Sequence, residues 1–250
     1  MEDLNQQWKK MSLSKVEGTK CDLSKDKKVM EFVFAAKFFT RRTLNIEAVA
    51  RTFKPIWCPK RNFEVSIAGD NILLIDFELE ADAEKVLQGE PWAFDRHLVV
   101  LQQYDGSCPV KELSFNRTSF WVQIHNLPFS LMTVEAAISL GATLGTVSRP
   151  KDGVEMKGGN FMRVKVVVDV TKPLNRGRMI TWDQGRKGWV SFMYERLPNI
   201  CYWCGHLMHD DKECDVWLNN KGTLLREEQQ FSPTRKTIVE MQGFESLGTN

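Results

Sequence analysis

The amino-acid sequence predicts an α+β protein in which two mixed units precede a small cysteine-rich segment. Three observations carry this prediction. Apolar residues alternate with polar ones over several short stretches, which indicates half-buried strands, and other stretches repeat apolar residues at helical spacing. Three of the six cysteines fall within fourteen residues, Cys201 to Cys214. The chain has 250 residues, which is long enough for two small hydrophobic cores or one large one.

A first unit is expected after residues 1–28, which are polar and rich in lysine and which we expect to form a flexible N-terminal segment. Residues 32–39 are mostly apolar, aromatic or β-branched, and this composition predicts a strand. Thr43 and Pro55 enclose apolar residues at helical spacing. We therefore expect a helix that Thr43 caps and Pro55 ends.

The first unit continues with two more strands, a second helix and a last strand. Residues 63–67 and 72–77 predict a hairpin, because a Gly-Asp-Asn turn separates two apolar stretches. Residues 80–87 predict an acidic helix and residues 97–102 a strand. The resulting order, βαββαβ, is that of ferredoxin-like and RNA-recognition folds, and we assign it to residues 29–106.

A second, smaller α+β unit is predicted over residues 117–197. Its elements are a strand at 120–124, a helix at 133–144 and strands at 145–148, 161–170 and 189–194. This order, βαβββ, repeats part of the first unit without its second helix. Residues 216–250, beyond the cysteine-rich segment, are expected to form a polar tail.

Composition argues against several classes of protein. The formal net charge is only +2, so attraction to a polyanion must come from local patches and not from the overall field. The apolar stretches are far shorter than the ~20 residues that span a bilayer, and the N-terminus lacks the apolar core of a secretion signal. We therefore expect an intracellular protein, in the nucleus or cytoplasm, with no membrane partner.

The cysteine-rich segment, residues 198–215, carries the strongest functional signal. Its spacing, Cys201-x2-Cys204-x4-His209-x4-Cys214, supplies three thiolates and one imidazole, the ligand set of a tetrahedral zinc ion. In a reducing compartment, clustered cysteines bind metal more often than they form disulfides. Because the protein fills all four positions, the expected zinc is structural and not catalytic. The alternatives are His206 as the fourth ligand and a set of reduced surface cysteines without metal.

Binding of single-stranded RNA or DNA is the leading functional hypothesis. Tyr202 and Trp203 lie between the first two ligands, where a loop without an interior should leave rings exposed for base stacking. The alternative is that one ring packs on a neighbouring unit. Basic residues of the second unit, interleaved with aromatic ones, suit a groove for a single strand; the candidates are Arg163, Lys165, Arg176, Arg178, Arg186 and Lys187. The alternative for these residues is an ordinary solvated face.

Other features favour a protein partner instead. The third-strand positions that hold base-stacking aromatic residues in RNA-recognition folds fall here at Ile72 and Leu74. Acidic residues surround the cysteine-rich segment and weaken phosphate attraction there; they are Asp210, Asp211, Glu213 and Asp215. The alternative function is therefore a protein interaction or self-assembly module, in which the zinc-binding segment docks a partner.

No residue is assigned a catalytic role. The sequence contains no Gly-rich phosphate loop, no H-E-x-x-H and no H-x-E with a P-C-x-x-C signature. His97 and His125, the two histidines outside the cysteine-rich segment, lie at the ends of expected strands, where we assign them structural roles. We therefore expect neither catalysis nor a small-molecule substrate.

Several short motifs occur in an order typical of one family. They are Arg42-Thr43-Leu44-Asn45, Gly69-Asp70-Asn71, Gly89-Glu90-Pro91-Trp92, Trp121-Val122-Gln123-Ile124 with Leu127-Pro128, Phe161-Met162-Arg163-Val164, Lys172-Pro173-Leu174 and Tyr194-Glu195-Arg196-Leu197-Pro198, followed by Cys201. The chain thus resembles a plant family in which a domain of unknown function precedes a CCHC zinc knuckle, as in gag-like proteins of non-LTR (LINE-type) retroelements. The resemblance covers roughly residues 29–214.

The resemblance implies a nucleic-acid-binding particle protein with no catalytic activity of its own. Members of the family commonly have glycine immediately before the histidine ligand, where this chain has Met208. Glycine suits an unusual backbone conformation, so Met208 predicts a strained or differently turned loop at this point.

Overall fold

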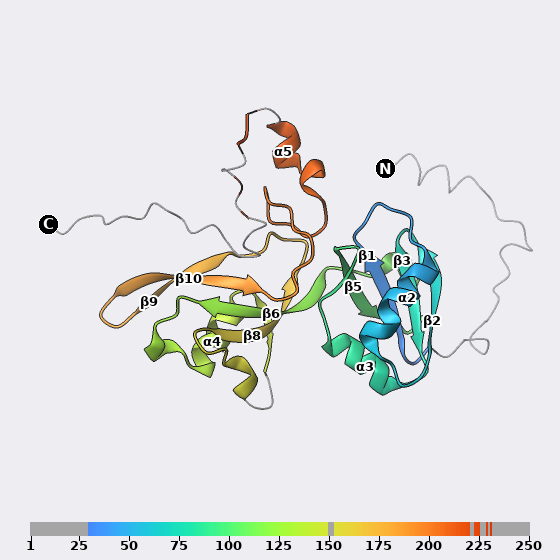
Figure 1. Ribbon diagram of the computed structural model, residues 1–250, viewed down its shortest axis with the longest axis horizontal. Coiled ribbons are helices and arrows are strands. Elements are labelled where there is room, and N and C mark those ends of the chain that lie inside the picture. The colour runs from blue at the N-terminus through green and yellow to red at the C-terminus, as the bar shows by residue number, and fades with distance from the viewer. Residues whose placement is uncertain (1–29, 150–152, 221–222, 226–228, 230, 232–250) are drawn as a thin grey trace, which may run out of the picture.

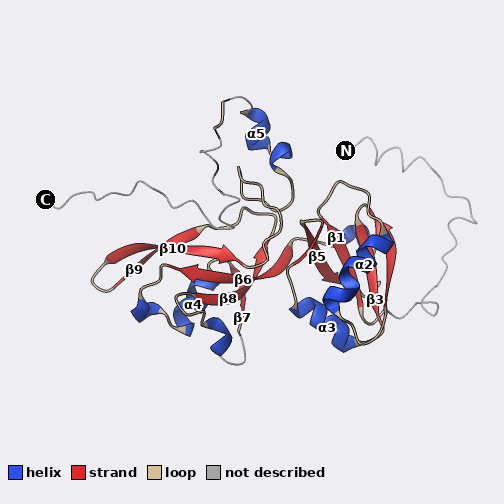
Figure 2. Cartoon of the chain, viewed as in Figure 1, coloured by secondary structure: helices blue, strands red, loops and turns tan. Residues whose placement is uncertain are grey.

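The computed structural model describes residues 30–149, 153–220, 223–225, 229 and 231. These residues form an α+β structure with two antiparallel five-stranded sheets (Figure 1, Figure 2). The expected N-terminal segment, residues 1–28, and most of the expected polar tail lie outside the described residues. No described helix is long and apolar enough to cross a membrane.

The first sheet and its two helices are built from residues 33–103. In chain order the elements are β1 (Val33–Phe38), α2 (Ile46–Trp57), β2 (Phe63–Gly69), β3 (Ile72–Phe77), α3 (Glu80–Gln88), β4 (Trp92–Phe94) and β5 (His97–Gln103). In space the strands follow the order β2-β3-β1-β5-β4. The sequence predicts all of these elements except β4, because three residues are too few to show an alternation.

The first helix begins and ends at other residues than the sequence predicts. Asn45 caps α2, since its side chain accepts a hydrogen bond from a first-turn amide at 3.0 Å. Thr43 is therefore not the cap. Pro55 lies inside the last turn without ending the helix, because it removes only one backbone hydrogen bond. Trp57, which follows it, is buried and stacks on Phe53 at 4.5 Å, and this contact stabilises the last turn.

The helix-covered face of the first sheet is packed with aromatic side chains. Phe34 and Phe38 of β1 point to this face and are almost fully buried. Phe53 and Trp57 of α2 meet the ring of Trp92 edge-on, at 6.2 and 5.8 Å. Burial of one such side chain contributes roughly 2 kcal/mol. The first sheet therefore has a core that its own helices complete.

The opposite face of the first sheet (the first outer face) is aliphatic and covered. Val33 and Ala35 of β1 lie on this face and are buried in one cluster with Tyr104, which follows β5. Leu98 and Val100 of β5 point to the same face and belong to the core of the second sheet. The first outer face is therefore an interface inside the molecule.

The second sheet repeats the strand order of the first. Its elements are β6 (Arg117–His125), η2 (Phe129–Leu131), α4 (Val134–Ala142), β7 (Gly145–Ser148), η3 (Val154–Met156), β8 (Met162–Asp169), β9 (Gly177–Trp182) and β10 (Arg186–Tyr194). The spatial order is β7-β8-β6-β10-β9. Each strand has a counterpart in the first sheet, and within the described residues only a counterpart of α3 is missing, as the partial repeat in the sequence predicts. The sequence does not predict β9, because three of the six residues of this edge strand are exposed.

A single described α-helix, α4, covers the inner face of the second sheet. It lies over β7 and β8, and its buried residues Ala137 and Leu140 join the second core. Side chains from other segments complete this core; they are Leu98 of β5, Leu174, Leu197 and Leu207. Leu207 belongs to the cysteine-rich segment, so the second core is complete only when that segment is in place.

Candidate metal centre

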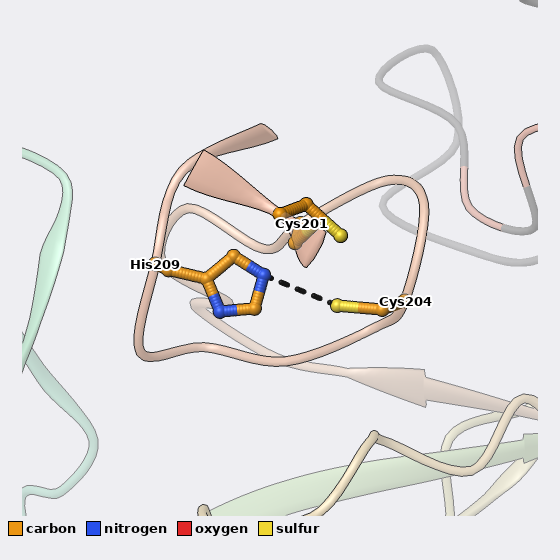
Figure 3. Close-up of side chains that lie close together, drawn as sticks. Cys201, Cys204 and His209 are labelled. Carbon is orange, nitrogen blue, oxygen red and sulfur yellow. Dashed lines mark hydrogen bonds between the residues drawn. The ribbon is translucent and has the colours of Figure 1, made fainter. Parts of the chain in front are cut away.

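The chain leaves β10 and enters the cysteine-rich segment, where four side chains converge. Figure 3 shows Cys201, Cys204 and His209 facing one another. Together with Cys214, their ligand atoms all lie within 4.8 Å of one another, and Cys204 Sγ is 3.2 Å from His209 Nε2. Bonds of about 2.0–2.3 Å in a tetrahedron place ligand atoms about 3.3–3.8 Å apart. The four side chains can therefore close around one zinc ion with small shifts.

A glycine makes the turn after the second cysteine. Gly205 has a φ of +78°, a left-handed conformation that residues with a Cβ rarely adopt. The Gly205 amide donates to the Cys201 carbonyl, and the Cys201 amide donates to the His206 carbonyl, both at 2.8 Å. Met208 is not among the residues with positive φ. Met208 therefore does not have the positive φ that a strained residue here would show, and the left-handed conformation in this loop lies at Gly205.

His206, the alternative fourth ligand, lies beside the ligand set. The ligand group includes His209 and not His206. His206 Nδ1 is 3.3 Å from Cys204 Sγ, and its ring also interacts with the backbone of Thr171. Burial, and then the neighbouring His209, lower the pKa of His206, so its ring is neutral at pH 7. His206 thus supports a ligand and connects the segment to the chain after β8.

The ligand thiols lie in an environment that disfavours free thiolates. Cys201 and Cys214 are 0% and 1% exposed. Burial raises the pKa of the Cys201 and Cys204 thiols. A bound cation stabilises the thiolates and displaces their protons, so metal binding is coupled to the folding of this segment.

Comparison with known families agrees with this geometry. Residues 168–216 match the zinc knuckle family. Residues 31–111 match a second family, which is described as a domain of unknown function (DUF4283). The order of the two matches confirms that a domain of this kind precedes a zinc knuckle.

One protein with a similar sequence comes from a plant. The chain is 26% identical, over 138 residues, to an uncharacterized protein of Arabidopsis thaliana, At4g02000. The match covers 54% of this chain and 43% of the relative, so the chain spans less than half the length of that curated relative. No solved structure matches the chain significantly.

The knuckle is fixed to both sheets. Leu207 is buried in the second core, and the Leu174 amide donates to the Gly205 carbonyl at 3.0 Å. On the side of the first sheet, the Asn199 amide donates to the Arg96 carbonyl at 2.7 Å. Because these contacts reach both sheets, the knuckle has one orientation relative to each of them.

Trp203 packs inside the molecule and does not remain exposed. Its side chain is only 7% exposed, and its ring stacks on Trp217 at 5.0 Å with an angle of 17°. Trp217 belongs to α5 (Asp215–Asn219), which follows the last ligand directly, and Leu224 packs against the same cluster. The expectation that this loop leaves its rings exposed is wrong for Trp203, because α5 supplies the interior that the ligand loop lacks. The expected polar tail therefore begins with an ordered helix.

Tyr202 keeps a partly exposed ring. Its amide donates to the Asp211 carboxylate at 2.6 Å. Burial, and then the Asp211 carboxylate, raise the pKa of the Tyr202 hydroxyl, while Arg96 of the first sheet opposes them. Of the two rings singled out in the sequence, Tyr202 is the one that a base could still reach.

Arg163 and Lys165 of β8 already have partners within the protein. Arg163 lies over the Trp121 ring, 4.5 Å from its centroid, and pairs with Glu195 at 3.4 Å. The Lys165 ammonium donates to the Gln88 carbonyl at 2.6 Å, and burial lowers the pKa of Lys165. Both side chains are therefore held in place and are less available to phosphate than an extended surface lysine.

The other basic candidates lie in or next to the hairpin of β9 and β10. Arg178, Arg186 and Lys187 are exposed, and Arg176 is half-buried just before β9. The strand register places Lys187 on the same face as Trp189, and Arg178 and Arg186 on the opposite face. The structure thus divides the six basic candidates between the middle of the second sheet and its hairpin.

Sequence reasoning misses two contributors near these sites. Phe231 covers the turn of the knuckle, since a Cβ on Gly205 would lie 2.4 Å from its ring. His125, expected to have an ordinary structural role, lies 4.9 Å from the Phe161 ring on the exposed face of the second sheet. The alternation of strand β6 already indicates that His125 lies on the outer face, because Phe120 is buried and His125 points to the other side of the sheet. No local pattern indicates the contact of Phe231.

Proposed function

We propose that this protein is a non-catalytic, zinc-dependent nucleic-acid-binding protein that acts on single-stranded RNA or DNA and is of the retroelement gag-like type. The observation that carries the proposal is the zinc knuckle, whose ligand atoms lie within 4.8 Å of one another and which is anchored on a sheet with a basic hairpin. Zinc would be held by Cys201, Cys204, His209 and Cys214 and, when bound, supplies folding energy to their loop. Reduced thiols suit the nucleus or cytoplasm.

A single strand suits these surroundings better than a duplex. Unpaired bases can stack on partly exposed rings, whereas a duplex presents mainly its phosphates. The knuckle offers Tyr202 but is bordered by acidic residues, namely Asp210, Asp211, Glu213 and Asp215. Phosphate contacts therefore fall to basic residues elsewhere, chiefly those of the hairpin of β9 and β10.

The first sheet supports the proposal as a scaffold. Its order β2-β3-β1-β5 agrees with a ferredoxin-like or RNA-recognition fold, and we assign residues 29–106 to such a domain and residues 117–197 to the second unit. RNA-recognition domains stack bases on aromatic residues of their sheet. Here the sheet face away from the helices carries Val33 and Ala35 and is covered, so we assign RNA contacts to other surfaces.

The test is binding of the zinc-loaded full chain to a fluorescein-labelled single strand of about 20 nucleotides, RNA or DNA, between about 50 and 200 mM NaCl. We expect the affinity to fall steeply with salt and to weaken when zinc is chelated. Tyr202→Ala should weaken binding, whereas the matched variant Tyr202→Phe, which keeps a ring, should not. No binding at the lowest salt would refute the proposal. If the affinity for the single strand is the same before and after zinc is chelated, binding does not depend on zinc and that part of the proposal is wrong.

A protein interaction or self-assembly module is the second candidate, and the exposed side of α5 favours it. Val216 and Leu218 are 44% and 50% exposed there. If this helix docks a second copy, Leu218→Glu should reduce self-association in sedimentation velocity and leave the affinity for a single strand unchanged. If Leu218→Glu sediments in the same way as the parent protein, this second candidate function is wrong.

A further inference from the structure

The face of the second sheet opposite α4 (the second outer face) is built very differently from the first outer face. Eight of the alternate residues of β6, β8 and β10 that lie on it are Trp121, Gln123, His125, Arg163, Lys165, Trp189, Ser191 and Met193. All of them except Ser191 are half-buried. Within the described part of the chain, none of the aromatic residues on this face belongs to a hydrophobic cluster. These rings are therefore not used to build a core.

A chain of contacts holds the middle of the second outer face in one conformation. His125 Nε2 lies 2.9 Å from Gln123 Oε1, and the Gln123 amide donates to Glu195 at 3.0 Å. Glu195 pairs with Arg163, which lies over Trp121. Because each side chain is held by the next, a ligand pays little conformational entropy to order this surface.

Aromatic side chains continue from the middle of this face towards the hairpin. The Trp189 ring packs over Gly177, where a Cβ would lie 2.6 Å from the ring, so the glycine allows the ring to lie close to the sheet. Met179, the register partner of Trp189, is 57% exposed beside it. From Trp189 to Trp121 the register spans about six residues, or about 20 Å along the strands.

The charge of this region favours a polyanion. On this face the strands carry Arg117, Arg163, Lys165 and Lys187 against Asp169, while Glu195, which follows β10, pairs with Arg163. Lys187 is exposed on the same face as Trp189, at the hairpin end. Aromatic rings with basic side chains around them are the elements of a surface for a single strand.

We propose that the second outer face holds the single strand, with unpaired bases stacked on the rings of Trp189 and His125 and on the Arg163 guanidinium that lies over Trp121, and with a phosphate on Lys187. The inference rests on the proposed function and names its site. The length of the face accommodates about four to six nucleotides. A peptide added as a further strand fits poorly, because β6, β8 and β10 each pair with strands on both sides and have no free edge.

The first test places a negative charge on the face without touching the core. Met179→Glu should weaken binding of the labelled single strand about fivefold, because it places a carboxylate near the phosphates. The matched control is Ile67→Glu, which adds the same charge to an aliphatic residue that is 67% exposed on β2 of the first sheet. The control should bind as the parent does, and both variants should retain zinc and the thermal midpoint of the parent.

The second test removes a ring. His125→Ala should weaken binding by at least about fivefold, the lower limit of what one stacked base contributes. Its matched control is Phe129→Ala, because Phe129 is 89% exposed on η2 and lies outside the strands that form the face. Photocrosslinking with a 4-thiouridine-substituted strand should then give peptide adducts in β6 and β10.

The outcomes separate this inference from the proposed function. If the parent binds but Met179→Glu and His125→Ala behave like their controls, the site is wrong while the function stands. Adducts confined to Tyr202 would have the same meaning. If Met179→Glu reduces self-association and not strand affinity, the face is a protein interface and the inference fails. Absence of binding by the parent chain would remove the function and the site together.

Discussion

The two sheets have the same strand order, but they use the face that their helices leave free in opposite ways. In the first sheet this face carries Val33 and Ala35 and is buried within the molecule. In the second sheet it carries Trp121, Arg163 and His125 and remains partly exposed. The backbone plan is therefore shared, and the side chains at alternate strand positions decide whether a face becomes an interface or a candidate binding surface.

The inner faces differ in a second way. The first sheet is covered by two helices of its own, α2 and α3. The second sheet has α4, and its core is completed by Leu98 from the first sheet and Leu207 from the knuckle. The first core is therefore self-contained, whereas the second depends on both of its neighbours.

Removal of zinc should have the largest effect of the changes considered, and it should affect the second core and not the first. Structural zinc contributes about 10–16 kcal/mol to the folding of such loops, so chelation should unfold the knuckle and withdraw Leu207 from the second core. Hydrogen exchange measured by mass spectrometry should become faster in β6 and β10 and stay unchanged in β1 and β3. Equal acceleration in both sheets, or in neither, would contradict the asymmetry.

Truncation of Leu98 should give the next largest effect. Leu98 is 0% exposed and belongs to the second core although it lies on β5 of the first sheet. Leu98→Ala should lower the free energy of unfolding by about 2–5 kcal/mol in urea titrations. The control is Leu87→Ala on α3, where the leucine is 41% exposed and the change should cost much less. Equal costs would show that the two sheets do not share a core.

The helix caps test whether the two sheets unfold together. Asn45 and Thr133 cap α2 and α4 through side-chain hydrogen bonds of 3.0 and 3.1 Å. Asn45→Ala and Thr133→Ala should each cost about 1 kcal/mol, and Asn45→Asp and Thr133→Ser should cost less. Because Leu98 joins both sheets in the zinc-loaded protein, we expect each alanine variant to shift one common midpoint of global unfolding, whereas zinc removal opens the second sheet locally. Two transitions, each sensitive to one variant only, would separate the sheets.

The smallest expected effect concerns Glu90, which joins the sheets. Glu90 is 5% exposed and accepts a hydrogen bond from the Ser119 amide at 3.1 Å, and burial raises its pKa. A carboxyl group with a raised pKa in the folded state makes the protein less stable as the pH rises from its ordinary pKa through the folded one. Glu90→Gln removes this titration and keeps an oxygen that can accept the bond.

The variant should therefore gain stability relative to the parent as the pH rises from about 4 to about 7, as measured by urea unfolding at each pH. Parallel pH profiles for the two proteins would show that Glu90 doesn't titrate differently in the folded state.

Much of the fold is predictable because strands with one buried face show it locally. Phe120, Val122 and Ile124 alternate with polar or partly exposed residues, and the structure buries these three as expected. The edge strand β9 shows no such pattern because few of its residues enter a core. The end of α2 depends on the stacking of Trp57 on Phe53, which outweighs the lost hydrogen bond of Pro55, and a local rule for proline doesn't include that contact.

Some features of the candidate site are likewise predictable from local sequence, and others are not. The zinc ligands are predictable because their spacing within one short loop fixes their geometry. The burial of Trp203 is not predictable from that loop, because its partner Trp217 lies beyond the last ligand. Nor does the sequence indicate which outer face is covered, since this depends on Leu98 meeting a core built from residues far along the chain.

The position of Leu207 in the second core also sets an order of assembly during synthesis. The first sheet is complete when Gln103 has left the ribosome, but the second core lacks Leu207 for about a hundred further residues, which takes about 5–20 seconds. Until the knuckle has emerged and acquired its metal, a nascent chain has a finished first core and an unfinished second one. A chain that acquires its metal late therefore keeps the apolar residues of the second core open to solvent for longer than those of the first.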